Sequence, residues 1–161
     1  MNTKDQHIIA LLRSNGRIPL TKLSRESGIA VSTIFDRLRM HYPRYVKRFT
    51  ALLDFEALGY KAHAHVLFKS GSSRTALLRY LSGHPNINML YRINNGWDVL
   101  AELIFPDMKQ LEQFIDTLEQ RFTITERHIA YLLQEISREH FLSDPAILPQ
   151  GLNTRGRAKA A

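Results

Sequence analysis

The sequence contains no cysteine, which excludes disulfide bonds, thiolate zinc sites and a cysteine nucleophile. It has no run of about 18 or more apolar residues, the length that a membrane-spanning helix requires. Its first ten residues, MNTKDQHIIA, lack the basic and then apolar profile of a secretory signal. These absences predict a cytoplasmic protein with no membrane partner.

Sequence motifs of several common enzyme classes are also missing. The chain has no P-loop, no GxGxxG and no GxSxG motif. Nucleotide-dependent and serine-hydrolase mechanisms therefore lack support. The sequence predicts neither an enzyme nor a bound cofactor.

Positive charge, in contrast, is abundant and unevenly placed. The 161 residues carry a net charge of +7, with a hydrophobic content of 44% that is ordinary for globular proteins. Residues 1–54 hold ten Lys and Arg against four Asp and Glu, whereas residues 55–133 hold eight of each. A basic excess confined to one third of the chain indicates a nucleic-acid partner, and the three short helices of that third make double-stranded DNA the predicted one.

The first third predicts three short helices. The first ends at Asn15-Gly16, the second runs from Pro19 to Gly28, and the third runs from about Val31 to Tyr42. This order, with a tight turn at Gly28, is typical of a helix-turn-helix, in which the third helix enters the major groove.

Polar and basic residues lie on the outward face of this third helix if Ile34 and Leu38 face inward. Hydroxyl and guanidinium groups suit phosphates and bases, and a phenyl ring suits a thymine methyl. A solvated face on a small helical core is the alternative. We predict DNA contacts by Ser32, Thr33, Phe35, Asp36, Arg37 and Arg39, and by Lys47 and Arg48 beyond the helix.

The segment 45–53 is rich in residues that favour β-structure. It predicts a strand or wing that flanks the DNA groove, with a plain linker as the alternative.

Residues 60–133 alternate between strand and helix patterns. Asn94-Asn95-Gly96 separates two alternating runs, which is a strong hairpin signal. The order is the ferredoxin-like β-α-β-β-α-β unit, so the predicted fold class is α+β. The predicted elements are strand 60–69, helix 73–81, strands 87–93 and 99–105, a helix that begins at Pro106-Asp107, and strand 123–133.

Both faces of the predicted sheet carry apolar residues. Val66 and Phe68 point to one face, and Leu67, Leu90, Leu100 and Ile104 point to the other. Two helices can cover only one of these faces, so the remaining face requires a partner, most simply a second copy of the chain. The sequence therefore predicts a homodimer, which also suits a palindromic DNA site.

Histidines raise the question of a metal. His63-x-His65 places two imidazoles on one strand face, and His128 on the last strand is a third candidate ligand. Without an evident carboxylate beside them, we expect a polar or interface face and no metal.

Five segments of the chain, in this order and spacing, resemble the leucine-responsive regulator/asparagine regulator (Lrp/AsnC) family of transcription factors. They are Asp5-x-x-Ile8-x-x-Leu11-Leu12-x-x-Asn15-Gly16-Arg17, Leu23-Ser24-x-x-Ser27-Gly28-Ile29, Ser32-Thr33-Ile34-x-x-Arg37-Leu38, Leu58-Gly59-Tyr60 and Gly96-Trp97-Asp98.

The resemblance implies an N-terminal winged helix-turn-helix followed by a ferredoxin-like regulatory domain. It further implies a sequence-specific transcriptional regulator, associated with the nucleoid, that forms dimers and in some members tetramers or octamers. An amino-acid effector would bind near Gly96, Trp97 and Asp98, where Asp98 could answer an α-ammonium group. A structural role for this hairpin is the alternative.

Two observations qualify the resemblance. Ala30 precedes the third helix where the family usually has a hydroxyl residue, which costs about 1 kcal/mol of helix capping. Sirohaem decarboxylases are similar in architecture and use histidines, so an enzyme of that kind is the alternative function. The positive charge over the helix-turn-helix argues against it.

The predicted domains are residues 1–54 for DNA binding, 55–137 for regulation and oligomerisation, and 138–161 as a largely disordered tail. We expect the first turns of this tail, through Phe141, to be helical.

Overall fold

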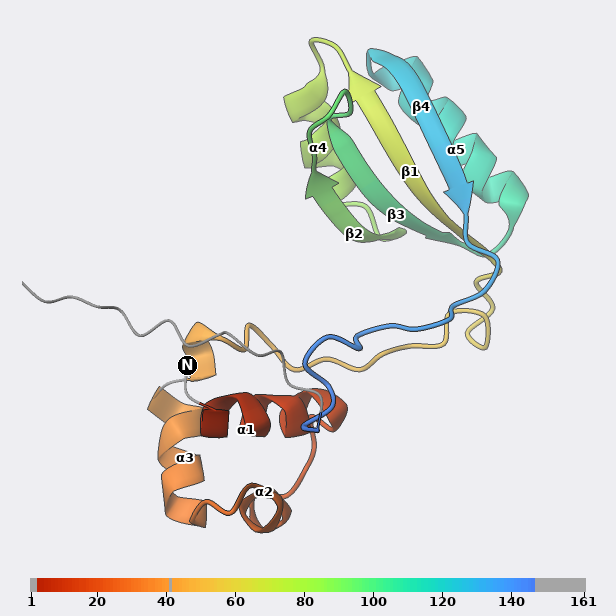
Figure 1. The fold of residues 1–161 in the computed structure, drawn as a ribbon. Coiled ribbons are helices and arrows are strands. Elements are labelled where there is room, and N and C mark those ends of the chain that lie inside the picture. Colours follow the sequence, from red (N-terminus) through yellow and green to blue (C-terminus); the bar gives the residue numbers. More distant parts are fainter. Residues whose placement is uncertain (1–2, 41, 147–161) are drawn as a thin grey trace, which may run out of the picture. The chain divides into compact units, whose positions relative to one another are not determined.

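The computed structural model describes residues 3–40 and 42–146 (Figure 1). The chain forms two compact units. Leu53–Glu135 makes up the second, and the first comprises the described residues before it together with residues 136–146.

The first unit contains the three predicted helices. They are α1 (Thr3–Ser14), α2 (Leu20–Ser27) and α3 (Val31–Met40), followed by the 3₁₀ turn η1 (Tyr42–Arg44). Gly28 ends α2 with a φ of 66°, a left-handed conformation that glycine adopts without strain. The helices share a small apolar core, whose buried members are Ile8, Leu12, Leu23, Ile29, Ile34 and Tyr42. The predicted helix-turn-helix is confirmed.

The second unit has the predicted β-α-β-β-α-β order. Its elements are β1 (Ala62–Ser70), α4 (Arg74–Ser82), β2 (Ile87–Arg92), β3 (Val99–Phe105), α5 (Met108–Arg121) and β4 (Ile124–Tyr131). The strands form one sheet in the order β2-β3-β1-β4, and each neighbouring pair is antiparallel. Both helices cover the same face of this sheet (Figure 1).

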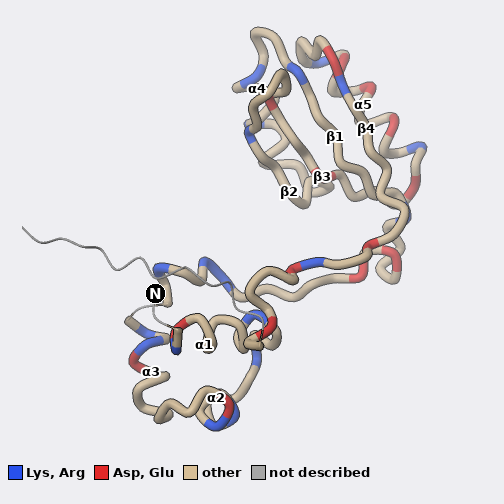
Figure 2. The backbone as a smooth tube through the Cα atoms, viewed as in Figure 1, with Lys and Arg blue, Asp and Glu red and all other residues tan. Residues whose placement is uncertain are grey.

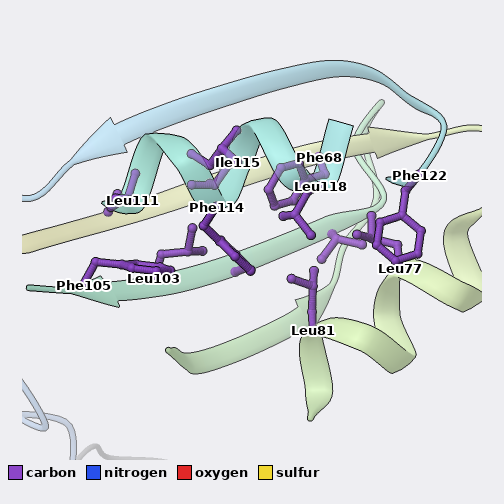
Figure 3. Close-up of a cluster of buried hydrophobic side chains, with 14 of the residues drawn as sticks. Phe68, Leu77, Leu81, Leu103, Phe105, Leu111, Phe114, Ile115, Leu118 and Phe122 are labelled. Carbon is purple, nitrogen blue, oxygen red and sulfur yellow. The ribbon is translucent and has the colours of Figure 1, made fainter. Parts of the chain in front are cut away.

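Strict alternation along β1 positions the core. Ala62, Ala64, Val66 and Phe68 are each at most 1% exposed, while the residues between them face the other side of the sheet. Figure 3 shows Phe68 against residues of α5 such as Ile115 and Leu118. We call the side that α4 and α5 leave uncovered the open face.

In β2 the side chains do not alternate between the two faces of the sheet as predicted. The register shifts between Ile87 and Met89, so Leu90 pairs with Ala101 and packs against the core. A bulge inserts one unpaired residue into a strand, so each side chain beyond it points to the face opposite the one that simple alternation predicts. The prediction that Leu90 shares a face with Leu67 was wrong, because Leu67 alternates with the core residues of β1 and lies on the open face.

Two predicted elements are not formed in the described part of the chain. Residues 46–54 belong to no helix or strand, because a strand requires hydrogen bonds to a neighbour. Residues 132–146 contain no helix, and positive φ angles at Glu139 (57°) and Leu142 (56°) interrupt any helical path there. Glu139 instead pairs with Arg13 of α1. The expected disorder of the tail end, residues 147–161, lies outside the described residues, as does His41 of the predicted third helix; α3 is described to Met40, and Tyr42 already begins η1.

Among the described residues, no helix has both the length and the apolar character needed to cross a membrane.

The start of α3 provides a stability test. The amide of Ile34 donates to the carbonyl of Ala30 at 3.0 Å, which makes Ala30 the N-cap, and its side chain is exposed. We expect Ala30→Ser to stabilise the first unit by about 1 kcal/mol, because the hydroxyl can accept from a free amide of the first turn. Urea unfolding followed by circular dichroism measures this.

The matched control is Ala10→Ser, which places a hydroxyl at a fully buried position of α1 and should destabilise. Equal effects of the two substitutions would contradict capping at Ala30.

Candidate nucleic-acid interface

The outward face of α3 is built as the sequence predicts. Ile34 is fully buried and fixes the rotation of the helix. Phe35 is 51% exposed, a large apolar surface for a monomer to leave in water. The polar residues of this face, Ser32, Thr33, Asp36 and Arg39, are exposed as well. Hydroxyl, phenyl and guanidinium groups are thus presented together from the first three turns of one helix.

Arg37 lies apart from this face. Its guanidinium is 2.5 Å from the Asp5 carboxylate of α1, and both side chains are less than one-quarter exposed. The pair adjoins the buried Tyr42. Burial and the negative charge of Asp5 raise the pKa of the Tyr42 phenol, whereas the positive charge of Arg37 lowers it. Arg37 therefore ties α3 to α1 within the unit.

Lys47 and Arg48 are exposed on the segment after η1, and two neighbouring side chains anchor this segment. Val46 packs against the core of the first unit, and its amide donates to the carbonyl of Tyr42 at 2.7 Å. The Phe49 ring lies so close to Gly16 that a Cβ there would meet it at 3.2 Å. Figure 2 shows Lys and Arg both in α3 and in the segment after η1.

The predicted effector residues lie on the hairpin between β2 and β3. Asn95 and Gly96 make the turn with φ angles of 65° and 89°. Trp97 is half-buried, and its ring centroid is 6.5 Å from that of His128 on β4.

Asp98 is held in place by the last residue of β1 and the first residue of α4. Its carboxylate accepts a hydrogen bond from the Ser70 amide at 2.8 Å and another from Arg74 of α4 at 3.1 Å. These two bonds, the amide first, hold the pKa of Asp98 below its usual range. The carboxylate thus joins the hairpin to the β1–α4 connection.

The histidines on the open face gather around a residue that the sequence reasoning missed. His63 and His65 approach Glu102 of β3, whereas His128 lies opposite Leu67. The signal was present, because Glu102 is the lone charged residue in the apolar run VLAELIF. Without the strand register it could not be placed beside the histidines.

A helix-turn-helix with an exposed third helix, followed by a ferredoxin-like domain, defines a class: two-unit DNA-binding regulators. Comparisons with known proteins identify the family. Residues 1–40 match the family described as winged helix-turn-helix DNA-binding, and residues 62–140 match the Lrp/AsnC ligand binding domain.

Curated relatives are regulators. The HTH-type transcriptional regulator FL11 of Pyrococcus horikoshii is 31% identical over 116 residues, which are 71% of this chain and 77% of the relative. FL11 of Pyrococcus furiosus is likewise 31% identical, over 70% of this chain and 76% of its own length. The chain belongs to the Lrp/AsnC family of transcriptional regulators, and the sirohaem-decarboxylase alternative finds no support.

Solved structures show the same fold. The transcriptional regulator NMB0573 of Neisseria meningitidis, in its L-Met complex, aligns with a TM-score of 0.79 at 22% identity, covering 86% of this chain and 93% of that one. AsnC of E. coli aligns with a TM-score of 0.74 at 16% identity, over 86% and 95% of the two chains. The predicted α+β architecture is confirmed.

The Asp98 hydrogen bonds predict a pH-dependent stability. The pKa of Asp98 is lower in the folded state than in the unfolded state, where it is about 4. Ionised Asp98 therefore stabilises the fold fully above about pH 4, and this stabilisation is lost as the pH falls through the folded-state pKa. We expect Asp98→Asn to lower the melting temperature of the second unit at pH 7. The difference from the wild type should shrink steadily below about pH 4.

Thermal unfolding across this pH range measures the effect. Asp116→Asn is the control, since its carboxylate is exposed and lies 3.9 Å from Arg127, a separation typical of weak surface pairs. If the difference in melting temperature between the wild type and Asp98→Asn persists unchanged at low pH, the stabilising role of ionised Asp98 is contradicted.

Proposed function

We propose that this regulator reads a specific DNA sequence through the first turns of α3. The observation that carries the proposal is the exposed set Ser32, Thr33, Phe35, Asp36 and Arg39 on a helix whose rotation the buried Ile34 fixes. Arg39 reads guanine or contacts phosphate, and Asp36 accepts from cytosine. Phe35 contacts a thymine methyl, while the hydroxyls of Ser32 and Thr33 bind base edges or phosphate.

We propose that the segment after η1 supplies the affinity for the DNA backbone. Lys47 and Arg48 are exposed cations, and the anchoring of Val46 and Phe49 keeps them near the third helix. Cations of this kind neutralise phosphates whatever the base sequence. Arg37 has a positioning role, because its guanidinium is committed to Asp5. We propose on this basis that the protein is cytoplasmic and associates with the nucleoid.

We further propose that the open face of the sheet is covered by a second copy. The face bears half-buried Leu67 and Leu100, which a single copy leaves in contact with water. A two-fold dimer presents two third helices to half-sites about 34 Å apart, one turn of DNA. Tetramers or octamers would then form from these dimers.

We propose an amino-acid effector at the β2–β3 hairpin. The exposed backbone of Gly96 and the half-buried ring of Trp97 form the contact surface. Because Asp98 already accepts bonds from Ser70 and Arg74, its role is to hold the hairpin in shape. The L-Met complex of NMB0573 supports this class of ligand.

The division of roles between Arg39 and Lys47 is testable by DNA titration. We expect Arg39→Ala to reduce discrimination at one base position by about 1–3 kcal/mol, since it removes a base contact. Lys47→Ala should weaken all sequences equally and lower the slope of log affinity against log salt by about 1. Sites selected from genomic fragments, measured over a salt series, provide the data.

Lys109→Ala is the matched control, because it removes an exposed cation from α5 of the other unit. A footprint should show two half-sites related by a dyad. Identical behaviour of the two DNA-face variants would overturn the proposed orientation of α3, and a single unpaired half-site would overturn the dimer.

Effector binding can be followed by tryptophan fluorescence, because Trp97 is the one tryptophan of the chain. We expect at least one of the twenty amino acids to shift the tryptophan emission in a saturable way. Gly96→Val should weaken this response, because the turn glycine has a φ of 89° that a β-branched residue resists. If no amino acid changes the emission or the DNA affinity, the effector proposal fails.

A further inference from the structure

Three metal-ligating side chains converge on the open face of the sheet. His65 of β1 pairs directly with Glu102 of β3, and His63 lies two residues back along β1, on the same face. The distance from Glu102 Oε1 is 2.7 Å to His63 Nε2 and 3.9 Å to His65 Nε2. All three potential ligand atoms lie within 4.8 Å of one another. We call these residues the imidazole–carboxylate cluster.

Glu102 is the unusual member of this cluster. The residue is 6% exposed, although it lies on the face that no helix covers. A buried carboxylate is costly unless a positive charge and hydrogen bonds compensate for its lost hydration. The side-chain amide of Asn88 supplies one hydrogen bond, donating to Oε2 at 2.6 Å. This bond leaves the other oxygen, Oε1, directed at the two imidazoles.

A hydrogen bond between His63 and Glu102 accounts for only part of this arrangement. His65 Nε2, at 3.9 Å, is too far from Oε1 for a hydrogen bond, yet it approaches the same oxygen. A tetrahedral ion with bonds of about 2.0–2.1 Å separates its ligand atoms by roughly 3.3 Å. The observed 2.7 Å and 3.9 Å bracket this value, so small side-chain rotations would admit an ion.

The chemistry of the donors identifies the class of ion. Two imidazole nitrogens and one carboxylate oxygen suit Zn²⁺ and its borderline neighbours Co²⁺ and Ni²⁺ better than Ca²⁺ or Mg²⁺. Asn88 would orient the carboxylate from the second layer of contacts, as partners of metal ligands commonly do. The Phe55 ring, edge-on to His63 with centroids 5.8 Å apart, forms an apolar wall beside the site.

We propose that His63, His65 and Glu102 bind one divalent transition-metal ion per chain on the open face of the sheet. The three side chains fill three positions of a tetrahedral site, and the fourth remains for water or another donor. The proposal is independent of DNA binding and of the amino-acid effector, because none of its residues lies on α3 or the hairpin.

The test uses the full-length chain without a polyhistidine tag, freed of metal by a chelator. Titration with CoCl₂ should produce the visible absorption bands of tetrahedral Co²⁺, and ZnCl₂ should displace them at one ion per chain. His65→Gln and Glu102→Gln should each weaken Zn²⁺ binding by about 100-fold or more. Asn88→Ala should weaken it by about 10–100-fold.

His128→Gln is the matched control, since it removes an imidazole opposite Leu67 but outside the cluster, and Zn²⁺ binding should not change. Thermal unfolding guards against misfolded variants: Zn²⁺ should raise the melting temperature of the wild type and of His128→Gln but not of His65→Gln. Absence of Co²⁺ bands in the wild type would overturn the proposal. Equal Zn²⁺ affinity of His65→Gln and wild type would overturn it too.

Discussion

The register of β1 between β3 and β4 is the constraint on which the second unit depends. Because side chains alternate along a strand, a slip of one residue would turn Val66 and Phe68 outward and His65 inward. Burial of Phe68 beneath α5 fixes the register against such a slip. The same alternation then directs His63 and His65 to the open face. Core packing on one side of β1 therefore determines which chemistry the other side presents.

The first unit depends on a smaller set of contacts. Its apolar core is small, and Ile34 within it sets the rotation of α3. The Arg37–Asp5 ion pair links that helix to α1. Such a half-buried ion pair contributes more by geometry than by net energy, because desolvation offsets much of the attraction. The charge distribution follows the same division, since the basic excess lies in residues 1–54 and residues 55–133 carry equal numbers of both signs. Binding of a polyanion and packing of the sheet thus occupy different parts of the chain.

Local patterns were enough to predict most elements of the fold. Alternation in β1, the Asn-Gly turn and the inward residues Leu111 and Leu118 of α5 are encoded within a few positions of each other. Features that depend on pairing between distant segments were not predictable in this way. The bulge in β2 moved Leu90 to the core, and Glu102 meets His65 only through the β1–β3 register. The ion pair of Arg37, one of the predicted DNA contacts, is a further example, because its partner Asp5 lies 32 residues away and no local pattern connects the two.

The segment 46–54 shows why β-propensity alone is a weak guide. Its residues favour strands, yet a strand exists only where a neighbour offers hydrogen bonds, and none of the described residues of this chain does so here. Phe49 and Leu52 remain about 60% exposed, so the segment keeps much of its apolar surface in contact with water. Of the described segments without regular structure, this one joins the DNA-binding residues to the sheet. The contacts of Val46 and Phe49 with the first unit, and not strand pairing, therefore hold the beginning of this segment in place.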